Sequence, residues 1–232
     1  MNKDNSNKSI CVTGSSRGLG RALCEVFLAD SEFRVYAVTR NPDSLNDLKE
    51  KHGDRLDVIK GDISTSEGRD LIFHSLNGYL DILIHNAGKL VFKDFDSITE
   101  KELKSVYEVN VFAPFLLTQK LLPLFNKTHV INISSIGGVE GSLKFAGLSA
   151  YSSSKAALNC LTEMLSEEFK DTENSFNCLA LGSVGTEMFK SAFSGVDASS
   201  TPDEMARYIY SFALDAPKVM RGKIISVSKS NP

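Results

Sequence analysis

Short apolar runs alternate along the chain with longer segments of helical periodicity, and no other feature constrains the fold as strongly. The runs are rich in Val and Ile and apolar on both faces, which is typical of strands buried inside a parallel sheet. Predicted strands cover residues 9–13, 34–39, 57–60, 80–85, 129–134, 176–180 and 223–227. Predicted helices lie between them, at residues 18–30, 43–52, 65–77, 99–125, 151–170 and 202–215.

This order of elements predicts an α/β fold with a doubly wound, seven-stranded parallel sheet (Rossmann-like) and helices on both faces. The 232 residues contain no internal repeat and no Pro/Ser-rich linker, so we expect a single domain over residues 1–232. Asp43 and Thr99, the latter followed by Glu102, are predicted N-caps of two helices. Ligands bind such sheets at the carboxyl ends of the strands, so the residues after each strand are the candidate site.

The charge balance and the spacing of Cys and His argue against several classes of protein. Lys and Arg total 26 against 29 Asp and Glu, without the basic cluster typical of nucleic-acid binding, so we expect no nucleic-acid partner. No apolar run approaches the roughly 18 residues of a membrane span, and the first residues do not resemble a signal peptide. Four Cys and four His lack metal-ligand spacing, so we expect reduced thiols, a cytoplasmic location, no membrane partner and no metal.

A glycine-rich segment follows the first predicted strand and opens the first predicted helix. Its pattern is G-x-x-x-G-x-G, and its candidate cofactor-binding residues are Gly14, Ser16, Arg17, Gly18, Leu19 and Gly20. Glycines let the backbone approach a diphosphate closely, and a helix N-terminus offers free N–H groups and the positive end of its dipole. The alternative is a tight turn without a ligand. The strand before it and the helix after it favour a phosphate cradle.

The end of the second predicted strand indicates which dinucleotide binds. An acidic residue at this place accepts from the ribose 2′-hydroxyl of NAD, whereas an arginine accommodates the 2′-phosphate of NADP. The chain has Arg40 here and no acid before Asp43, and Arg17 supplies a second guanidinium. Guanidinium groups form charge-assisted hydrogen bonds to phosphate, so we predict NADP(H) as the cofactor. The alternative is that Arg40 is a solvated surface residue.

Tyr151 and Lys155 stand four residues apart in a predicted helix and therefore share a face. Free tyrosine titrates near 10. A cation about 4 Å from the phenolate contributes roughly 4 kcal/mol at an effective dielectric constant near 20. This corresponds to a decrease of about three pKa units, as an upper estimate. The pair therefore suits general acid–base catalysis near neutral pH, although chance surface pairs of this kind are common.

Together these motifs resemble the short-chain dehydrogenase/reductase family, from about residue 9 to residue 227. The resemblance rests on the glycine loop, Tyr151 with Lys155, and polar residues after the other strands, namely Asp62, Asn86-Ala87-Gly88, Asn110 and Asn132-Ile133-Ser134-Ser135. It implies that Ser135 polarises the substrate oxygen, Tyr151 exchanges its proton, and Lys155 lowers the pKa of Tyr151 and binds the nicotinamide ribose. Asn110 would support a water-linked proton relay. The remaining implied cofactor contacts are Asp62, Ile63, Asn86, Ala87, Gly88, Val184 and Thr186.

Two alternatives remain, one about the catalytic serine and one about the role of Asn110. The interval from Ser135 to Tyr151 is longer than in the family pattern, so Ser134 is the alternative to Ser135 as the catalytic serine. Pro114 lacks an N–H, which frees the Asn110 carbonyl to bind water, but the same proline could merely kink the helix. The chain also departs from the family in having Leu181 where a proline is usual before the glycine.

Residues 183–200 form a long predicted loop that we interpret as a mobile lid over the substrate. Apolar residues of this loop and of neighbouring loops predict a pocket for a cyclic or aromatic carbonyl or alcohol, although they could equally be core; they are Met188, Phe189, Phe193, Phe92 and residues 137–145. By the family resemblance, the outer faces of helices 99–125 and 151–170 pair subunits in a homodimer or homotetramer.

The leading hypothesis is an NADP(H)-dependent oxidoreductase that moves a hydride between nicotinamide and a carbonyl/alcohol pair, with Tyr151 as general acid/base. A non-catalytic NADP-binding regulator on the same fold is the first alternative. A sugar-nucleotide epimerase or dehydratase is the second, and the short chain leaves little room for it.

Overall fold

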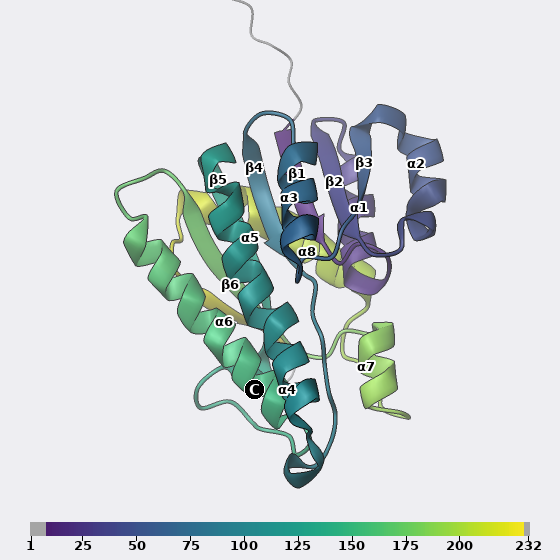
Figure 1. Ribbon diagram of the computed structural model, residues 1–232, viewed down its shortest axis with the longest axis vertical. Coiled ribbons are helices and arrows are strands. Elements are labelled where there is room, and N and C mark those ends of the chain that lie inside the picture. The colour runs from purple at the N-terminus through teal and green to yellow at the C-terminus, as the bar shows by residue number, and fades with distance from the viewer. Residues whose placement is uncertain (1–7, 230–232) are drawn as a thin grey trace, which may run out of the picture.

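The computed structural model of the chain describes residues 8–229 and contains one sheet of seven parallel strands (Figure 1). The strand order is β3-β2-β1-β4-β5-β6-β7. The strands are β1 (Lys8–Thr13), β2 (Phe33–Thr39), β3 (Leu56–Lys60), β4 (Leu80–His85), β5 (Phe125–Ser135), β6 (Ser175–Leu181) and β7 (Ile224–Val227). The predicted doubly wound α/β sheet is therefore confirmed. β5 begins earlier than predicted, at Phe125 instead of residue 129.

Helices cover both faces of the sheet, which explains why most of its strands are apolar on both sides. One face packs on α1 (Gly18–Ala29) and α8 (Pro202–Asp215), through Phe27, Ile209 and their neighbours. The other face packs on α3 (Ser66–Ser75), α5 (Ala113–Leu121) and α6 (Ser149–Glu168), through residues such as Ile72 and Leu117. Both clusters are dominated by side chains that are fully buried.

The predicted helix 99–125 is not continuous. It consists of α4 (Glu100–Tyr107), a π-helical turn (Glu108–Phe112), α5 and a 3-10 turn (Leu122–Leu124). In the π turn the N–H of Ala113 donates to the carbonyl of Glu108, five residues back, instead of the usual four. Pro114 follows directly. It has no N–H to donate to the carbonyl of Asn110, and this missing hydrogen bond is the local cause of the π turn.

One of the two predicted helix caps is confirmed. Thr99 and Glu102 form a reciprocal capping box at the start of α4. Asp43 is not an N-cap, because it lies inside a 3-10 turn (Pro42–Leu45) that precedes α2 (Asn46–His52). Pro42 suits the first position of this turn, because the N–H that it lacks would have no partner there in any case.

The carboxyl ends of the strands gather the loops that carry the candidate residues. From β1 the chain adds β2 and β3 on one side of the sheet, then crosses back and adds β4 to β7 on the other side. The order of the strands therefore reverses between β1 and β4, which lie next to each other. Figure 1 shows α7 (Glu187–Ala192) at the same end of the molecule as the beginnings of α4 and α6. None of the helices in the described part of the chain has the length and hydropathy of a membrane span.

Candidate active site

The loop between β1 and α1 is built for close backbone approach. Gly14 has φ +73°, and a Cβ there would lie 2.8 Å from the Cα of Ala87. A Cβ on Gly20 would lie 2.2 Å from the carbonyl oxygen of Gly14. α1 begins at Gly18, and the side chain of Arg17, at the N-cap position, makes no capping hydrogen bond to residues 8–229. The first N–H groups of α1 and its positive dipole end are thus suited to a diphosphate.

Asn86 ties the end of β4 to this loop. Its Nδ2 donates to the carbonyls of Thr13, at 2.9 Å, and Gly14, at 3.3 Å. In return, the Thr13 hydroxyl accepts from the N–H groups of Asn86 and Ala87, each at 3.1 Å. Thr13 was not among the predicted site residues. The signal for it was a hydroxyl at the last position of the strand that leads into the glycine loop.

The ends of β2 and β3 bring a cation and a carboxylate together. Arg40 directly follows β2 and, like Arg17, is exposed. Burial acts to raise the pKa of Asp62, but hydrogen bonds from the Ser64 hydroxyl and N–H, together with the charge of Arg40, lower it overall. Ile63, the next residue, is buried. This edge therefore presents two guanidinium groups and an ionised carboxylate near the start of the glycine loop.

Tyr151 and Lys155 lie on one face of α6, as predicted. The Lys155 Nζ is 5.7 Å from the centroid of the Tyr151 ring and donates to the Ile133 carbonyl at 2.8 Å. Ser135, at the end of β5, forms a hydrogen bond with Tyr151 that acts to lower its pKa. Ser134 instead donates to the backbone carbonyl of Lys155. The geometry thus favours Ser135 over Ser134 as the partner of Tyr151.

The expected effect of Lys155 on Tyr151 is not present in the protein alone. Burial raises the pKa of Tyr151 to about 12, and only the Ser135 hydrogen bond opposes this. Burial also lowers the pKa of Lys155 to about 8, with Cys178 opposing. The prediction of a phenol acidified by Lys155 was therefore wrong for these residues by themselves. The physical reason is that desolvation of the phenolate dominates while the ammonium is held by a carbonyl above the ring.

Asn110 lies fully buried in the π turn, next to Lys155. Its Oδ1 accepts from the N–H of Lys89 at 2.7 Å, and its Nδ2 donates to the Lys89 carbonyl and the Ser154 hydroxyl, each at 2.9 Å. A Cβ on Gly88 would lie 3.6 Å from Asn110 Oδ1 and 3.7 Å from Lys155 Nζ. The Asn110 side chain therefore fixes the loop after β4. Ser154 was missed, although its place between Tyr151 and Lys155 was a usable signal.

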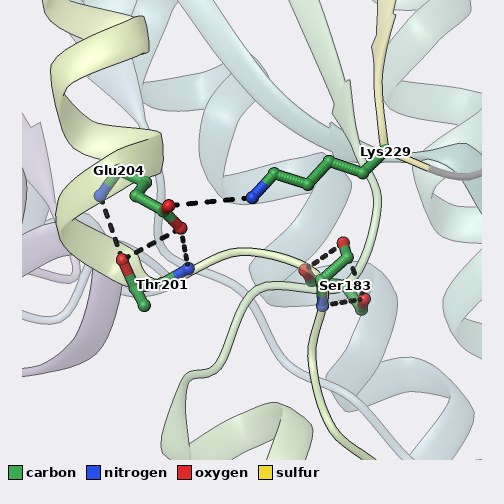
Figure 2. A network of polar contacts seen from close by, with 5 residues as sticks. Ser183, Thr201, Glu204 and Lys229 are labelled. Carbon is green, nitrogen blue, oxygen red and sulfur yellow. Dashed lines mark hydrogen bonds and ion pairs between the residues drawn. The ribbon is translucent and has the colours of Figure 1, made fainter.

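Residues 183–200 contain α7 instead of being an unbroken loop, and their two ends are bonded together. Val184 pairs with Ser200 in an isolated bridge, and the Ser183 hydroxyl accepts from the N–H of Ser199 at 2.9 Å. Figure 2 shows Ser183 beside the start of α8, where Thr201 and Glu204 form a capping box. Lys229 pairs with Glu204 there, at 3.7 Å.

The same segment spans the site from the glycine loop to the loop after β4. At one end, a Cβ on Gly18 would lie 3.1 Å from Glu187 Oε2 and 3.2 Å from Thr186 Cγ2. The Thr186 hydroxyl also caps α7 by accepting from the N–H of Phe189. At the other end, the ring of Phe193 contacts the ring of Phe92, with centroids 5.2 Å apart. Val184 and Thr186 thus lie on the segment that borders the glycine loop.

The chain matches the family model for short chain dehydrogenase over residues 8–197. It belongs to the short-chain dehydrogenase family. The family fold binds a nicotinamide cofactor, so the protein is an NAD(P)-dependent oxidoreductase by family. Within residues 8–229, His, Cys, Asp and Glu side chains form no cluster that could hold a metal ion.

Two relatives of this short-chain dehydrogenase can be aligned with it over most of their length. An L-2,3-butanediol dehydrogenase of Corynebacterium glutamicum is 31% identical over 230 residues, which cover 92% of this chain and 87% of that protein. An uncharacterised oxidoreductase of Saccharomyces cerevisiae is 33% identical over 205 residues, covering 86% and 80%.

Among solved structures with the same fold, one contains NADH and another contains NADP+. A 4-hydroxyisoleucine dehydrogenase complexed with NADH is 27% identical, with a TM-score of 0.85 over 96% of this chain and 97% of that one. The closed form of a serine dehydrogenase complexed with NADP+ is 22% identical and shows the fold alone, with a TM-score of 0.84 over 94% of each chain.

Proposed function

We propose that this protein is an NADP(H)-dependent oxidoreductase that acts on a carbonyl/alcohol pair, with Tyr151 as general acid/base. One observation carries the proposal: Ser135, Tyr151 and Lys155 come together from β5 and α6 at the carboxyl edge of the sheet, the edge that carries the glycine loop. A hydroxyl, a phenol and an ammonium in this arrangement suit proton transfer to a substrate oxygen.

The residues at the carboxyl edge fit a dinucleotide. The glycine loop, with Ser16 and Leu19, would hold the diphosphate, and Asp62 with Ile63 would border the adenine. Asn86, Ala87, Gly88, Val184 and Thr186 would line the rest of the cleft. Arg17 and Arg40 are both exposed, and no acidic residue stands at the end of β2. These features support binding of a 2′-phosphate. When bound, the nicotinamide supplies or accepts the hydride.

The chain's own groups suit reduction of a carbonyl. With a pKa of about 12, Tyr151 keeps its proton at neutral pH and has it available to donate. Lys155, with a pKa of about 8, is a cation at that pH and would stabilise the phenolate left behind. Ser135 would donate to the same substrate oxygen, and the Asn110 carbonyl would bind the water of a relay.

The decisive experiment measures NADPH oxidation against a panel of aldehydes, ketones, quinones and diketones. Tyr151→Phe should abolish turnover, whereas Tyr79→Phe, at an exposed site, should not change it. Full turnover by Tyr151→Phe would remove the proposed acid. Arg40→Asp should shift the preference from NADPH toward NADH, and an unchanged ratio would reject Arg40 as the phosphate-binding residue.

The alternative is a non-catalytic NADP-binding regulator, with which a pKa of about 12 for Tyr151 is also compatible. Such a regulator needs no acidified phenol. NADPH binding without turnover of any compound on the panel would support it.

We also propose that residues 183–200 act as a mobile lid on a single domain, and that the protein is a homodimer or homotetramer. Half-exposed apolar side chains on the outer faces of α4, the π turn, α5 and α6 support the assembly; they are Leu103, Phe112, Phe115 and Met164. Phe115→Glu should shift the mass measured by light scattering toward the monomer.

The four free cysteines support a reducing compartment such as the cytoplasm.

A further inference from the structure

Three aromatic rings from two distant segments meet above the site. Phe92, in the loop after β4, contacts Phe193 edge to face, with ring centroids 5.2 Å apart. Phe193 in turn packs against Phe189, with centroids 5.1 Å apart. We refer to Phe92, Phe189 and Phe193 as the aromatic cluster. It joins the segment containing α7 to the loop between β4 and α4.

Gly147 fixes the place of this cluster relative to the proposed catalytic residues. Its φ is +82°, and a Cβ there would lie 2.9 Å from the ring of Phe92. The N–H of Lys93 donates to the Gly147 carbonyl at 3.0 Å. Phe92 therefore lies against the turn that leads into α6, whose first helical turn contains Tyr151. The aromatic cluster thus adjoins the turn that leads into the helix of the proposed proton donor.

Several apolar side chains in the segments next to the aromatic cluster are exposed. Phe92 stays 47% exposed although its ring contacts another ring. Large apolar side chains in the loop before α6 and in α7 are also exposed, namely Leu143, Phe145 and Met188. The ammonium of Lys144, in the same loop as Leu143, is held by the Val139 carbonyl and the Ser142 hydroxyl. Apolar surface concentrated on three segments of one site is typical of a ligand-binding region.

We propose that the substrates carry an aromatic or similarly bulky apolar group next to the reacting carbonyl or alcohol, and that Phe92 and Phe193 determine this specificity. The proposal rests on the proposed function and names the substrate class of the same site. Aromatic groups pack edge to face or offset on such rings, and water is removed from both surfaces. A methyl group in the same position contacts little of the cluster, and a carboxylate must be desolvated against it.

Three dicarbonyl probes that differ in one substituent test this. Acetylbenzoyl, diacetyl and pyruvate join the same acetyl group to a benzoyl group, a second acetyl group and a carboxylate. With NADPH we expect kcat/KM for acetylbenzoyl to exceed that for diacetyl by at least about tenfold, with pyruvate lower still. Phe92→Ala and Phe193→Ala should each lower kcat/KM for acetylbenzoyl severalfold more than kcat/KM for diacetyl, which reduces the preference.

Matched variants separate a ring contact from a general effect. Phe95 lies in the same loop as Phe92 and is 83% exposed, so Phe95→Ala should keep the full preference. Phe193→Leu retains apolar volume without a ring and should restore only part of the preference lost in Phe193→Ala. Equal kcat/KM for acetylbenzoyl and diacetyl in the unmodified protein would overturn the proposal. Equal losses for both diketones in Phe92→Ala and Phe193→Ala would also overturn it.

Calorimetric binding of the two diketones to the NADPH-loaded Tyr151→Phe variant distinguishes the two proposals. Tighter binding of acetylbenzoyl with no turnover by the unmodified protein would contradict the proposed function and support the specificity. Turnover of both diketones without any preference in binding or rate would support the function and overturn the specificity.

Discussion

Replacing Lys155 by methionine tests the energetics of the site, because this ammonium is 3% exposed and strongly desolvated. Burial lowers its pKa from 10.5 to about 8, with Cys178 opposing. At about 1.36 kcal/mol for each pKa unit, the charged form destabilises the folded protein by about 3 kcal/mol. This penalty is fully present below pH 8 and disappears as the pH rises toward 10.5.

The direction of the pH dependence follows from proton counting. Between these two pKa values the unfolded chain keeps a proton on Lys155 that the folded protein has released, so the free energy of unfolding rises with pH. From pH 7 to pH 10 the expected gain from Lys155 is about 2–3 kcal/mol. Tyr151, with its pKa raised to about 12, acts in the opposite direction but is present in both proteins. The difference between the two pH curves therefore isolates Lys155.

Urea unfolding of the unmodified protein and Lys155→Met at several pH values between 7 and 10 measures this difference. We expect the two free energies of unfolding to diverge by about 2–3 kcal/mol over the range, with the rise missing in the variant. Lys101→Met, at an exposed lysine of α4, is the matched control and should leave the rise intact. Parallel curves for the unmodified protein and Lys155→Met would refute the reasoning.

Three further predictions concern the loops and thiols. Gly20→Ala should abolish NADPH binding in a fluorescence titration, because the new Cβ would lie 2.2 Å from the carbonyl oxygen of Gly14. Gly61→Ala is the control and should bind NADPH normally, because its Cβ would have no atom closer than 3.4 Å. Equal affinities of the two variants for NADPH would contradict this. Thr13→Val removes the acceptor of two N–H groups and should lower the free energy of unfolding by about 2–4 kcal/mol in urea, and an unchanged midpoint would argue against the contact. In the native protein a chromogenic disulfide reagent should react rapidly with Cys160 alone, because Cys160 is exposed and burial raises the pKa of the other three thiols to about 12. Rapid release of more than one equivalent of the coloured thiol per chain would contradict the burial of Cys11, Cys24 and Cys178.

Features that depend on near neighbours in the chain were predictable. Apolar runs of strand length predicted all seven strands, although the edge strands β3 and β7 are only partly buried. The inner strands need apolar side chains on both faces because helices cover both. The capping box of Thr99 and Glu102 and the shared face of Tyr151 and Lys155 follow from helical geometry over a single turn. Likewise the glycines of the first loop mark a close approach of backbone, although not its partner.

Features that depend on distant segments emerged only with the tertiary structure. Asn86 was predicted to line the cofactor cleft, but its amide also binds the carbonyls of Thr13 and Gly14, a contact set by the pairing of β1 with β4. The contact of Phe92 with Phe193 joins two loops that no local pattern relates. The tertiary structure also decided the pKa of Tyr151, which an isolated helix with Lys155 would lower and which burial raises to about 12. Local sequence determines backbone preference and which side chains share a face, whereas desolvation is set by every group that packs around a site.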